Sequence, residues 1–285
     1  MNKKKSFKRV QMESFFIAGA GLMGGSLIKA LRKAYPQSII RAGVRKPDQY
    51  PELKNWTDGV FALDQIPLIK EKTIAVINTP VYTIPDLAEI LAGKLTQDSI
   101  ITDVGSTKQG ITEALKGIKN FIGSHPMAGK EKAGFEHSDP SIFIDKTAAI
   151  CPYDFHQEEM ILRLEKFWQS IGMKTIRIAP SEHDWVTAYS SHLPHALSFI
   201  FGALGKNEKM DLKGIYGNSF LEFSRIGKSE EEIWIPIFQS NKKNLVVLIE
   251  KFIKFLYRFQ ETLENNQPEE IKKLIEDSKE FLKTI

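Results

Sequence analysis

Three glycines near the start of the chain have a spacing that suits phosphate binding. The stretch GAGLMG contains Gly19, Gly21 and Gly24 in the pattern GxGxxG. The apolar run Phe15–Ala18 precedes it, and a stretch of helical character, Leu22–Ala34, follows it. In that context the first glycine permits a tight turn, the second admits a pyrophosphate close to the backbone, and the third lets helix and strand pack closely. Amide groups at the start of the helix can then bind the phosphates. We therefore predict a dinucleotide site formed by Gly19, Gly21, Leu22, Met23 and Gly24.

The residues after the second predicted strand bear on the choice between NAD and NADP. An NAD site usually places Asp or Glu there, to bind the 2′-hydroxyl of the ribose. Here the acidic position falls near Val44, and Arg45 and Lys46 follow it. Two cations without a carboxylate favour the 2′-phosphate of NADP. An inward-turned Asp48 would instead favour NAD, and if the two cations were simply solvated they would favour neither nucleotide. We therefore expect NADP or NAD as the cofactor, with NADP preferred.

A histidine in a constrained loop is the first candidate for acid–base chemistry. The stretch GSHPMAGKEKAG, residues 123–134, places His125 before Pro126, which restricts the backbone, and among glycines, which permit unusual turns. An imidazole with an ordinary pKa of about 6.5 is available in its neutral, proton-accepting form at neutral pH. From these residues alone, His125 is either a catalytic group or a histidine in a turn.

Other polar residues follow two further predicted strands. Ser106 comes just after the fourth strand, in DVGSTK, while Thr79 and Pro80 end the third strand. Ligands of open α/β sheets lie outside the carboxyl ends of the strands. We expect Thr79 and Pro80 to border the nicotinamide half of a cofactor. Ser106 can contact a ligand, cap the helix behind it, or do both.

The stretch SSHLPH carries polar groups on a predicted helix. Ser191 and His195 are four positions apart and so share one face, and Pro194 removes a helical hydrogen bond and favours a kink. We predict that Ser191 and His195 lie on the substrate side, whereas His192 is either near them or packed within the helices. No third ligand stands at the usual spacing for a metal site, so we predict none.

Strand-like and helix-like stretches alternate up to about residue 179, and only helical stretches follow. This pattern predicts an N-terminal Rossmann-type, doubly wound, mostly parallel α/β sheet, followed by an all-α C-terminal domain. The predicted boundaries are a flexible basic tail at 1–13, a dinucleotide-binding domain at 14–179 and a helical domain at 180–285. The predicted strands are 15–18, 38–44, 72–80, 99–105, 120–126, 146–152 and 174–180.

The composition limits the classes of partner. Apolar residues make up 42% and charged residues 26% of the 285, which is typical of a globular protein. The net charge of +4 suits an anionic small ligand and is too weak to indicate nucleic acid. No stretch has the length and apolar character of a membrane span. The single cysteine, Cys151, excludes an intramolecular disulfide and a cysteine metal cluster, and we expect a cytoplasmic protein.

Taken together, these motifs resemble those of the prephenate and arogenate dehydrogenases of tyrosine biosynthesis. Besides the His125 loop, the stretches DVGSTK (103–108), EHDWVTAYSSHLPHAL (182–197) and FSRIGKSEEEIW (223–234) look like family motifs in the family's order. The resemblance extends over nearly everything from Phe15 onward. It implies oxidative decarboxylation of a cyclohexadienol by hydride transfer to a nicotinamide cofactor, in a homodimer joined through the helical domain.

The resemblance also implies roles for particular residues. His125 matches the catalytic histidine, which draws off the proton of the ring hydroxyl, and Ser106 is placed to orient it. Arg225 matches the arginine that binds the dianionic substrate, because a guanidinium holds a carboxylate with two parallel bonds. Trp234 either walls the pocket or packs between helices. His183 and Asp184 suit a helix start better than catalysis.

The sequence leaves several functions open. The side chain that distinguishes prephenate from arogenate is read by residues that spacing does not identify. A β-hydroxyacid dehydrogenase also joins a Rossmann domain to a helical one, but such enzymes resemble a lysine-centred site, whereas this chain has a serine and histidines there. A non-catalytic dinucleotide sensor would keep the glycine loop without needing His125, Ser106 and Arg225 together.

Overall fold

The structure is a computed structural model that describes residues 13–129 and 134–285. The predicted basic tail, residues 1–13, lies outside the described residues apart from Glu13. Residues 130–133 of the loop after His125 also lie outside them. Within residues 13–129 and 134–285, no helix has the length and apolar character needed to cross a membrane.

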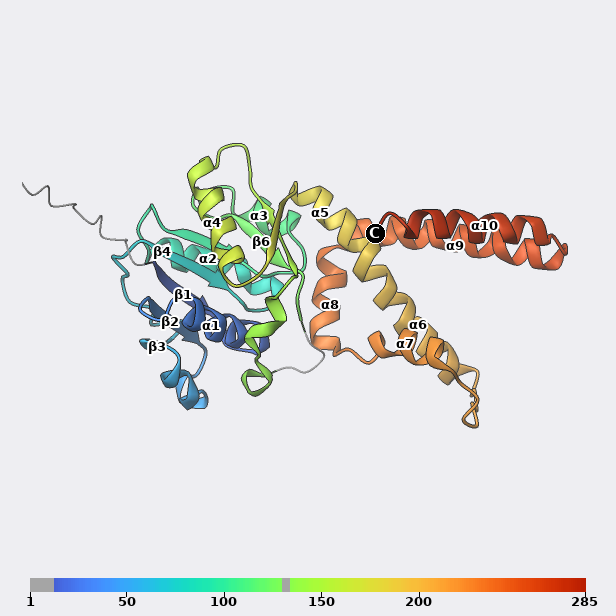
Figure 1. The fold of residues 1–285 in the computed structure, drawn as a ribbon, viewed down its shortest axis with the longest axis horizontal. Coiled ribbons are helices and arrows are strands. Elements are labelled where there is room, and N and C mark those ends of the chain that lie inside the picture. Colours follow the sequence, from blue (N-terminus) through green and yellow to red (C-terminus); the bar gives the residue numbers. More distant parts are fainter. Residues whose placement is uncertain (1–12, 130–133) are drawn as a thin grey trace, which may run out of the picture. The chain divides into compact units, whose positions relative to one another are not determined.

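Five strands form a parallel sheet, as the alternating pattern predicts (Figure 1). The strand order is β3-β2-β1-β4-β5. One strand, β3, was not predicted, because its four residues lie at the edge of the sheet and are only partly buried. The strands are β1 (Ser14–Ala18), β2 (Ile39–Val44), β3 (Gly59–Ala62), β4 (Thr73–Ile77) and β5 (Ile100–Asp103).

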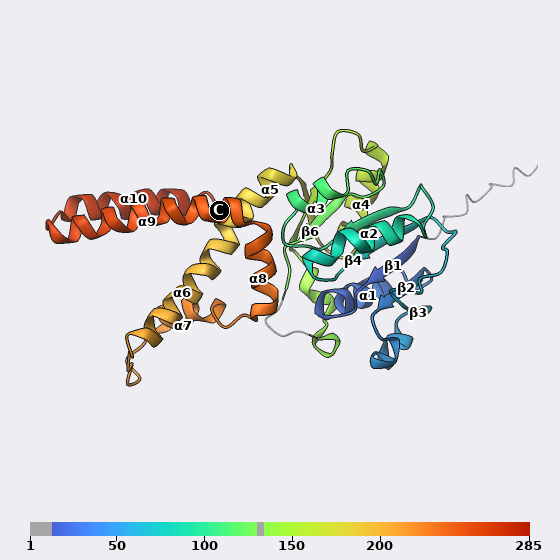
Figure 2. The ribbon, with the colours of Figure 1, turned by 180° about the vertical axis from the view of Figure 1, so that it is seen from behind.

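Helices cover both faces of this sheet, which confirms the doubly wound architecture (Figures 1 and 2). Successive residues of a strand point to opposite faces. Phe15 and Ile17 of β1 therefore pack with α1 (Leu22–Ala34) and α4 (Glu158–Ser170). Phe16 and Ala18 pack on the other face with α2 (Ile84–Ala92) and α3 (Gln109–Ala114). Burial on both faces explains why β1 has no polar alternation.

The last three predicted strands form a second, smaller sheet. It has the order β6-β7-β8, with β6 antiparallel to β7 and β7 parallel to β8. The strands are β6 (Gly123–Pro126), β7 (Thr147–Cys151) and β8 (Lys174–Arg177). A bridge between Ile101 of β5 and Phe121, two residues before β6, links the two sheets. The chain therefore carries His125 out of the main sheet while keeping it next to β5.

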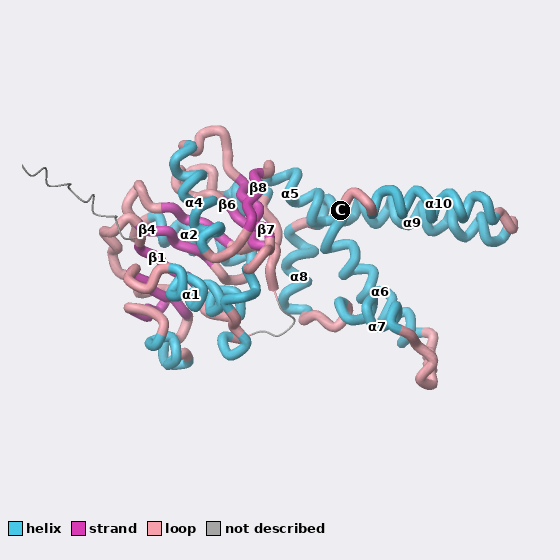
Figure 3. Tube along the Cα trace, in the orientation of Figure 1, coloured by secondary structure: helices cyan, strands magenta, loops and turns pink. Residues whose placement is uncertain are grey.

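From Pro180 onward the described chain is helical, as predicted (Figure 3). A π-helical turn, Ala188–His192, separates α5 from α6 and ends just before Pro194. Helices α9 and α10 run side by side as an antiparallel pair. The helices are α5 (Pro180–Thr187), α6 (Leu193–Asn207), α7 (Asn218–Ile226), α8 (Glu231–Ser240), α9 (Lys242–Glu264) and α10 (Pro268–Leu282).

The chain divides into two compact units. The first contains the described residues up to Thr187 together with Ser229–Ser240, so α5 and α8 pack with the sheets. The second contains Ala188–Lys228 and Asn241–Ile285. The division at Thr187 coincides with the start of the π-helical turn. The domain boundary predicted between residues 179 and 180 remains a prediction.

Candidate functional site

The glycine loop has the geometry that a dinucleotide requires. Gly19 has a φ of +94°, which favours glycine, and a Cβ there would lie 2.7 Å from the carbonyl oxygen of Asn78. A Cβ on Gly24 would lie 1.8 Å from the carbonyl oxygen of Gly19. By contrast, a Cβ on Gly21 would meet no described atom within 4 Å. Gly21 occupies the N-cap position of α1, where no side-chain hydrogen bond caps the helix. The loop therefore fits a pyrophosphate at the helix N-terminus.

The ends of three neighbouring strands lie at the same edge of the sheet as this loop. Ala18 of β1 pairs with Ile77 of β4, which pairs with Asp103 of β5. The segments that follow these strands contain Gly19, Thr79 and Ser106, so the predicted cofactor and catalytic residues of the first unit gather at one edge. This is the edge where ligands of parallel sheets bind.

Asn78, which was not predicted, adds a polar group to this edge. Its Nδ2 donates to the carbonyl oxygen of Val76 at 3.0 Å, while its buried Oδ1 has no hydrogen-bond partner among the described residues. A buried acceptor without a partner costs free energy unless a ligand or water satisfies it. Next to it, the Thr79 hydroxyl accepts from the Thr83 hydroxyl at 2.7 Å. The position of Asn78 directly after a buried strand was the signal available in the sequence.

The residues predicted to choose the nucleotide follow β2. Val44 ends the strand and is buried, whereas Arg45 and Lys46 are exposed. Asp48 is also exposed, in the short 3₁₀ turn Pro47–Gln49. The two exposed cations therefore follow the strand that neighbours the glycine loop, where the Gly19 N–H donates to the carbonyl oxygen of Gly43 at 2.7 Å.

A buried ion pair holds β6 against the end of β5. The Lys108 ammonium bonds the Asp103 carboxylate, and both side chains are fully buried. Lys108 Nζ also donates to the carbonyl oxygen of Ser124 at 2.9 Å, and the Ser124 N–H donates to Asp103 Oδ1 at 3.2 Å. These bonds fix the residue before His125 to the strand before Ser106. Ser106 itself is partly exposed and does not occupy the N-cap position of α3, which is Lys108 and makes no side-chain capping hydrogen bond.

His125 is the first member of a chain of side chains that the sequence did not predict. Its Nδ1 lies 2.9 Å from His183 Nε2, and His183 Nδ1 lies 2.8 Å from Asp184 Oδ1. The Asp184 carboxylate in turn accepts from the backbone N–H groups of Lys108 at 2.6 Å and Gln109 at 2.9 Å. His183 and Asp184 are each 2% exposed. The Asp184 carboxylate therefore supplies the capping hydrogen bonds of α3. His183 and Asp184 thus make contacts beyond their own helix, which their place near its start did not indicate.

The second unit contains the predicted substrate residues. His195 Nδ1 lies 2.9 Å from the carbonyl oxygen of Ser191, and because a carbonyl oxygen only accepts, Nδ1 carries the proton. Burial lowers the pKa of His195, and the charge of Arg225 lowers it further, so the ring is neutral at neutral pH. Arg225 is exposed, in α7. His192 is 1% exposed, and its Nδ1 lies 3.1 Å from Asn241 Nδ2. Of the two roles that the sequence left open for His192, this is the one packed within the helices.

Trp234, whose role the sequence left undecided, and Cys151, to which it assigned no function, are both buried. Trp234 of α8 is 9% exposed and packs against Phe238, with ring centroids 5.4 Å apart. It therefore has a packing role in the first unit. Burial raises the pKa of the Cys151 thiol to about 12, so it stays protonated and behaves as a small apolar group.

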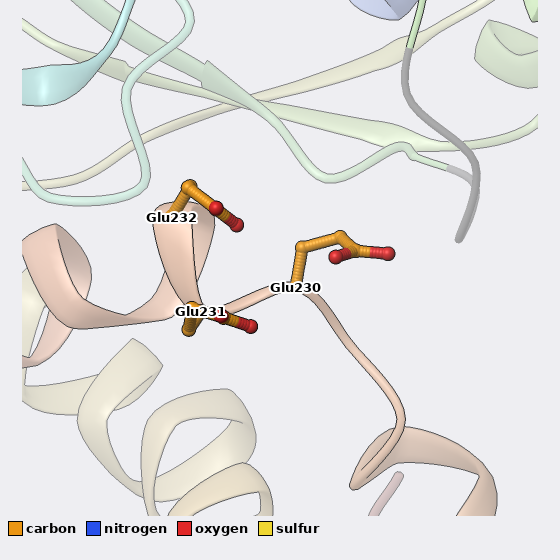
Figure 4. Close-up of side chains that lie close together, drawn as sticks. All are labelled: Glu230, Glu231 and Glu232. Atoms are coloured by element: carbon orange, nitrogen blue, oxygen red, sulfur yellow. The ribbon is translucent and has the colours of Figure 1, made fainter.

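One acidic cluster among the described residues has the spacing of metal ligands. Glu230, Glu231 and Glu232 bring carboxylate oxygens within 4.8 Å of one another at the start of α8 (Figure 4). All three are exposed, and acidic groups at a helix N-terminus are favoured by the helix dipole. The dipole accounts for the cluster, and the expected absence of a metal remains a prediction.

A parallel sheet with a glycine loop at the carboxyl ends of its strands, joined to an added helical unit, is typical of dehydrogenases that use a nicotinamide nucleotide. Residues 27–177 match the family model for the prephenate dehydrogenase nucleotide-binding domain, and residues 179–277 match the model for the prephenate dehydrogenase dimerization domain. The chain belongs to the prephenate dehydrogenase family. Its activity is that of a prephenate dehydrogenase in tyrosine biosynthesis, which sets aside the β-hydroxyacid dehydrogenase and the non-catalytic sensor.

Curated relatives and solved structures agree with this assignment. The chain is 26% identical over 278 residues to the prephenate dehydrogenase of Bacillus subtilis (strain 168), covering 94% of this chain and 75% of the relative. A crystal structure of prephenate dehydrogenase from A. aeolicus, in complex with hydroxyphenyl propionate and NAD+, has 29% identity and a TM-score of 0.85, covering 95% of this chain and 98% of that one. The structure of Synechocystis arogenate dehydrogenase, at 22% identity and a TM-score of 0.81, is a likeness of fold alone; it covers 95% of this chain and 99% of that one.

Proposed function

We propose that the chain converts prephenate to 4-hydroxyphenylpyruvate and carbon dioxide, with a nicotinamide nucleotide as the oxidant. The observation that carries the proposal is the gathering of the glycine loop, Ser106 and His125 around the carboxyl ends of β1, β4 and β5. A bound nicotinamide would supply the acceptor for the hydride that leaves C4 of the substrate ring. Loss of carbon dioxide then makes the ring aromatic, which supplies much of the driving force.

His125 acts in this proposal as the general base. It accepts the proton of the C4 hydroxyl as hydride leaves, so that a carbonyl group begins to form at C4 and the ring carboxylate departs as carbon dioxide. A positioned base of this kind typically contributes about 10²- to 10⁴-fold. The Ser106 hydroxyl bonds the substrate hydroxyl and keeps its proton directed at His125. The buried Asp103–Lys108 pair supports this by holding the backbone of Ser124 and Gly105, the residues just before His125 and Ser106.

Arg225, Ser191 and His195 form the substrate-binding group of the second unit in this proposal. The Arg225 guanidinium pairs with a carboxylate of the dianionic substrate. His195 carries its proton on Nδ1, so its Nε2 accepts a hydrogen bond, and the lowered pKa keeps the ring neutral. Ser191 is partly exposed in the π-helical turn, and turns of this kind are frequent at functional sites.

Among nicotinamide nucleotides, Arg45 and Lys46 support a preference for NADP. The residues that would hold the pyrophosphate are Gly19, Gly21, Leu22, Met23 and Gly24, while Thr79 and Pro80 would border the nicotinamide. The two exposed cations after β2 would pair with the 2′-phosphate. The A. aeolicus relative was solved with NAD+, so the two nucleotides must be compared directly in this chain.

We further propose a homodimer joined through the helical unit. Support comes from the dimerization-domain match and from large apolar side chains that are exposed along α9 and α10, among them Phe255 at 61% and Leu256 at 52%. A single copy leaves this apolar surface in water, which is unfavourable. The proposal includes a cytoplasmic location, supported by a lone, buried cysteine.

A steady-state assay of the full chain tests the function. Reduced nucleotide is followed by absorbance with prephenate or arogenate, each with NAD and with NADP. The expected result is turnover of prephenate with a higher kcat/KM for NADP. Higher kcat/KM with arogenate would reassign the substrate, and no reduction in any of the four combinations would refute the proposed function.

A further inference from the structure

We infer that His183 is a positioning residue for His125: backed by Asp184, it holds the His125 ring in the tautomer whose Nε2 accepts the substrate's proton. The inference rests on the proposed role of His125 as the base. His183 belongs to α5 and His125 to β6, and 58 positions separate them in the chain. Their contact is thus a product of packing within the first unit.

The Asp184 carboxylate is the buried end of the chain of side chains. As a carboxylate, Asp184 only accepts hydrogen bonds, and it accepts from the backbone N–H groups of Lys108 and Gln109. The group that faces Asp184 Oδ1 at 2.8 Å must therefore be a donor, which places a proton on His183 Nδ1. A neutral imidazole carries one such proton, so His183 Nε2 is an acceptor.

The acceptor on His183 determines the tautomer of the His125 ring in turn. His183 Nε2 lies 2.9 Å from His125 Nδ1, so His125 Nδ1 must donate and carries the proton of its ring. A neutral His125 then has its lone pair on Nε2. When Nε2 takes up the substrate's proton, the ring becomes cationic and its Nδ1–H bond to His183 becomes charge-assisted. Asp184 stabilises that charge through His183, because the two bonds polarise each other.

Burial makes this arrangement rigid. His183 and Asp184 are each 2% exposed, so water does not compete for their hydrogen bonds. The two imidazole rings meet edge to face, with centroids 5.1 Å apart and an interplanar angle of 69°. The Thr187 hydroxyl donates to the backbone oxygen of His183 at 2.9 Å, one turn further along α5. Asp184 is itself held at the start of α3, so the second histidine has little freedom to turn.

Nitrogen-15 NMR of the imidazole groups tests the inference on the intact protein. The chain has six histidines, so the His125 signals are assigned as those lost in His125→Asn. We expect the wild-type protein at neutral pH to carry its His125 proton on Nδ1. In His183→Ala the Nε2 tautomer should become populated, whereas His183→Gln, whose amide oxygen replaces the Nε2 acceptor, should keep the Nδ1 tautomer. A wild-type His125 protonated on Nε2 would overturn the inference without any variant.

Steady-state kinetics provide a second test, because a residue with a purely structural role would not change kcat selectively. His183→Ala should lower kcat about 100-fold, within the range that a misplaced base forfeits, and leave the prephenate KM within about threefold. His183→Gln should recover most of that loss, and the exposed His137→Ala should match the wild type. A folded His183→Ala with wild-type kcat would also overturn the inference. Wild-type turnover by His125→Asn would instead refute the proposed base, which keeps the two failures distinct.

Discussion

Gly24 packs against the backbone of Gly19 so closely that no side chain fits between them: a Cβ at position 24 would lie 1.8 Å from the Gly19 carbonyl oxygen. We expect Gly24→Ala to lower the free energy of unfolding by about 1–3 kcal/mol, since a backbone oxygen cannot turn away as a flexible side chain would. Alanine's better helix propensity returns only about 1 kcal/mol. Chemical denaturation measures the change.

Gly21→Ala is the matched control, because a Cβ there meets no described atom within 4 Å. We expect an unchanged free energy of unfolding but a KM for the nucleotide raised by about 10-fold or more, since the added methyl group occupies space needed by the pyrophosphate. An unchanged nucleotide KM would contradict the proposed location of the cofactor.

The guanidinium of Arg225 should be replaceable by an ammonium only at a cost in substrate binding. Arg225→Lys keeps the charge and loses the two-pronged geometry, so we expect the KM for prephenate to rise by about 10- to 100-fold. Arg177→Lys, an exposed arginine paired with Glu158 and Glu165 in the first unit, serves as the control and should leave KM unchanged. Steady-state kinetics that show no difference between the two variants would remove Arg225 from the site.

The two cations after β2 should set the preference between nucleotides. Removing both, in Arg45→Ala with Lys46→Ala, should lower the ratio of kcat/KM for NADP over NAD by about 10- to 100-fold, because the 2′-phosphate loses its partners. Lys33→Ala, an exposed cation on α1, should leave that ratio unchanged. A preference for NAD in the wild type would reverse the inference from this loop.

Acid should destabilise the fold through His156. Burial lowers the pKa of His156 below 6.5, and the Lys119 charge adds to the shift. The unfolded chain therefore binds this proton at higher pH than the folded chain does. The contribution of His156 to the free energy of unfolding is fully present above about pH 6.5. It decreases as the pH drops through that value, by at most about 1.4 kcal/mol per pH unit.

His156→Asn isolates this effect. In the wild type, the Tyr153 N–H donates to His156 Nδ1 at 2.8 Å. The asparagine keeps an acceptor for this N–H and cannot titrate. Between about pH 7 and pH 5.5 it should lose less stability than the wild type in denaturant titrations. The exposed His137→Asn should keep the wild-type slope. Equal slopes for the wild type and His156→Asn would exclude His156 as the cause.

The exposed apolar surface of α9 should be the dimer contact. Phe255→Glu places a charge in that surface, so we expect light scattering to report a dimer for the wild type and a monomer for this variant. Leu68→Glu alters an equally prominent apolar side chain, 71% exposed in the first unit, and should stay dimeric. A dimeric Phe255→Glu would place the contact elsewhere.

Much of the fold was predictable because its signals are local. The apolar run before Gly19, the glycine spacing and the helical stretch after it each involve a few adjacent residues, and all three appear as predicted in β1, its loop and α1. The edge strand β3 escaped prediction, because four partly buried residues lack a clear apolar pattern. The separate second sheet escaped it too, since one-dimensional alternation does not say which strands pair.

The sequence by itself determined the family, the order of the elements and the types of residue available for chemistry. Only the tertiary structure decided which of those residues meet. His125 and His183 are 58 positions apart, and no periodicity links them. The packing of α5 against α3 and β7 brings His125 Nδ1 to within 2.9 Å of His183 Nε2. The physical reason is that periodicity reports which face of an element is buried, whereas a hydrogen bond between elements depends on how the buried faces pack.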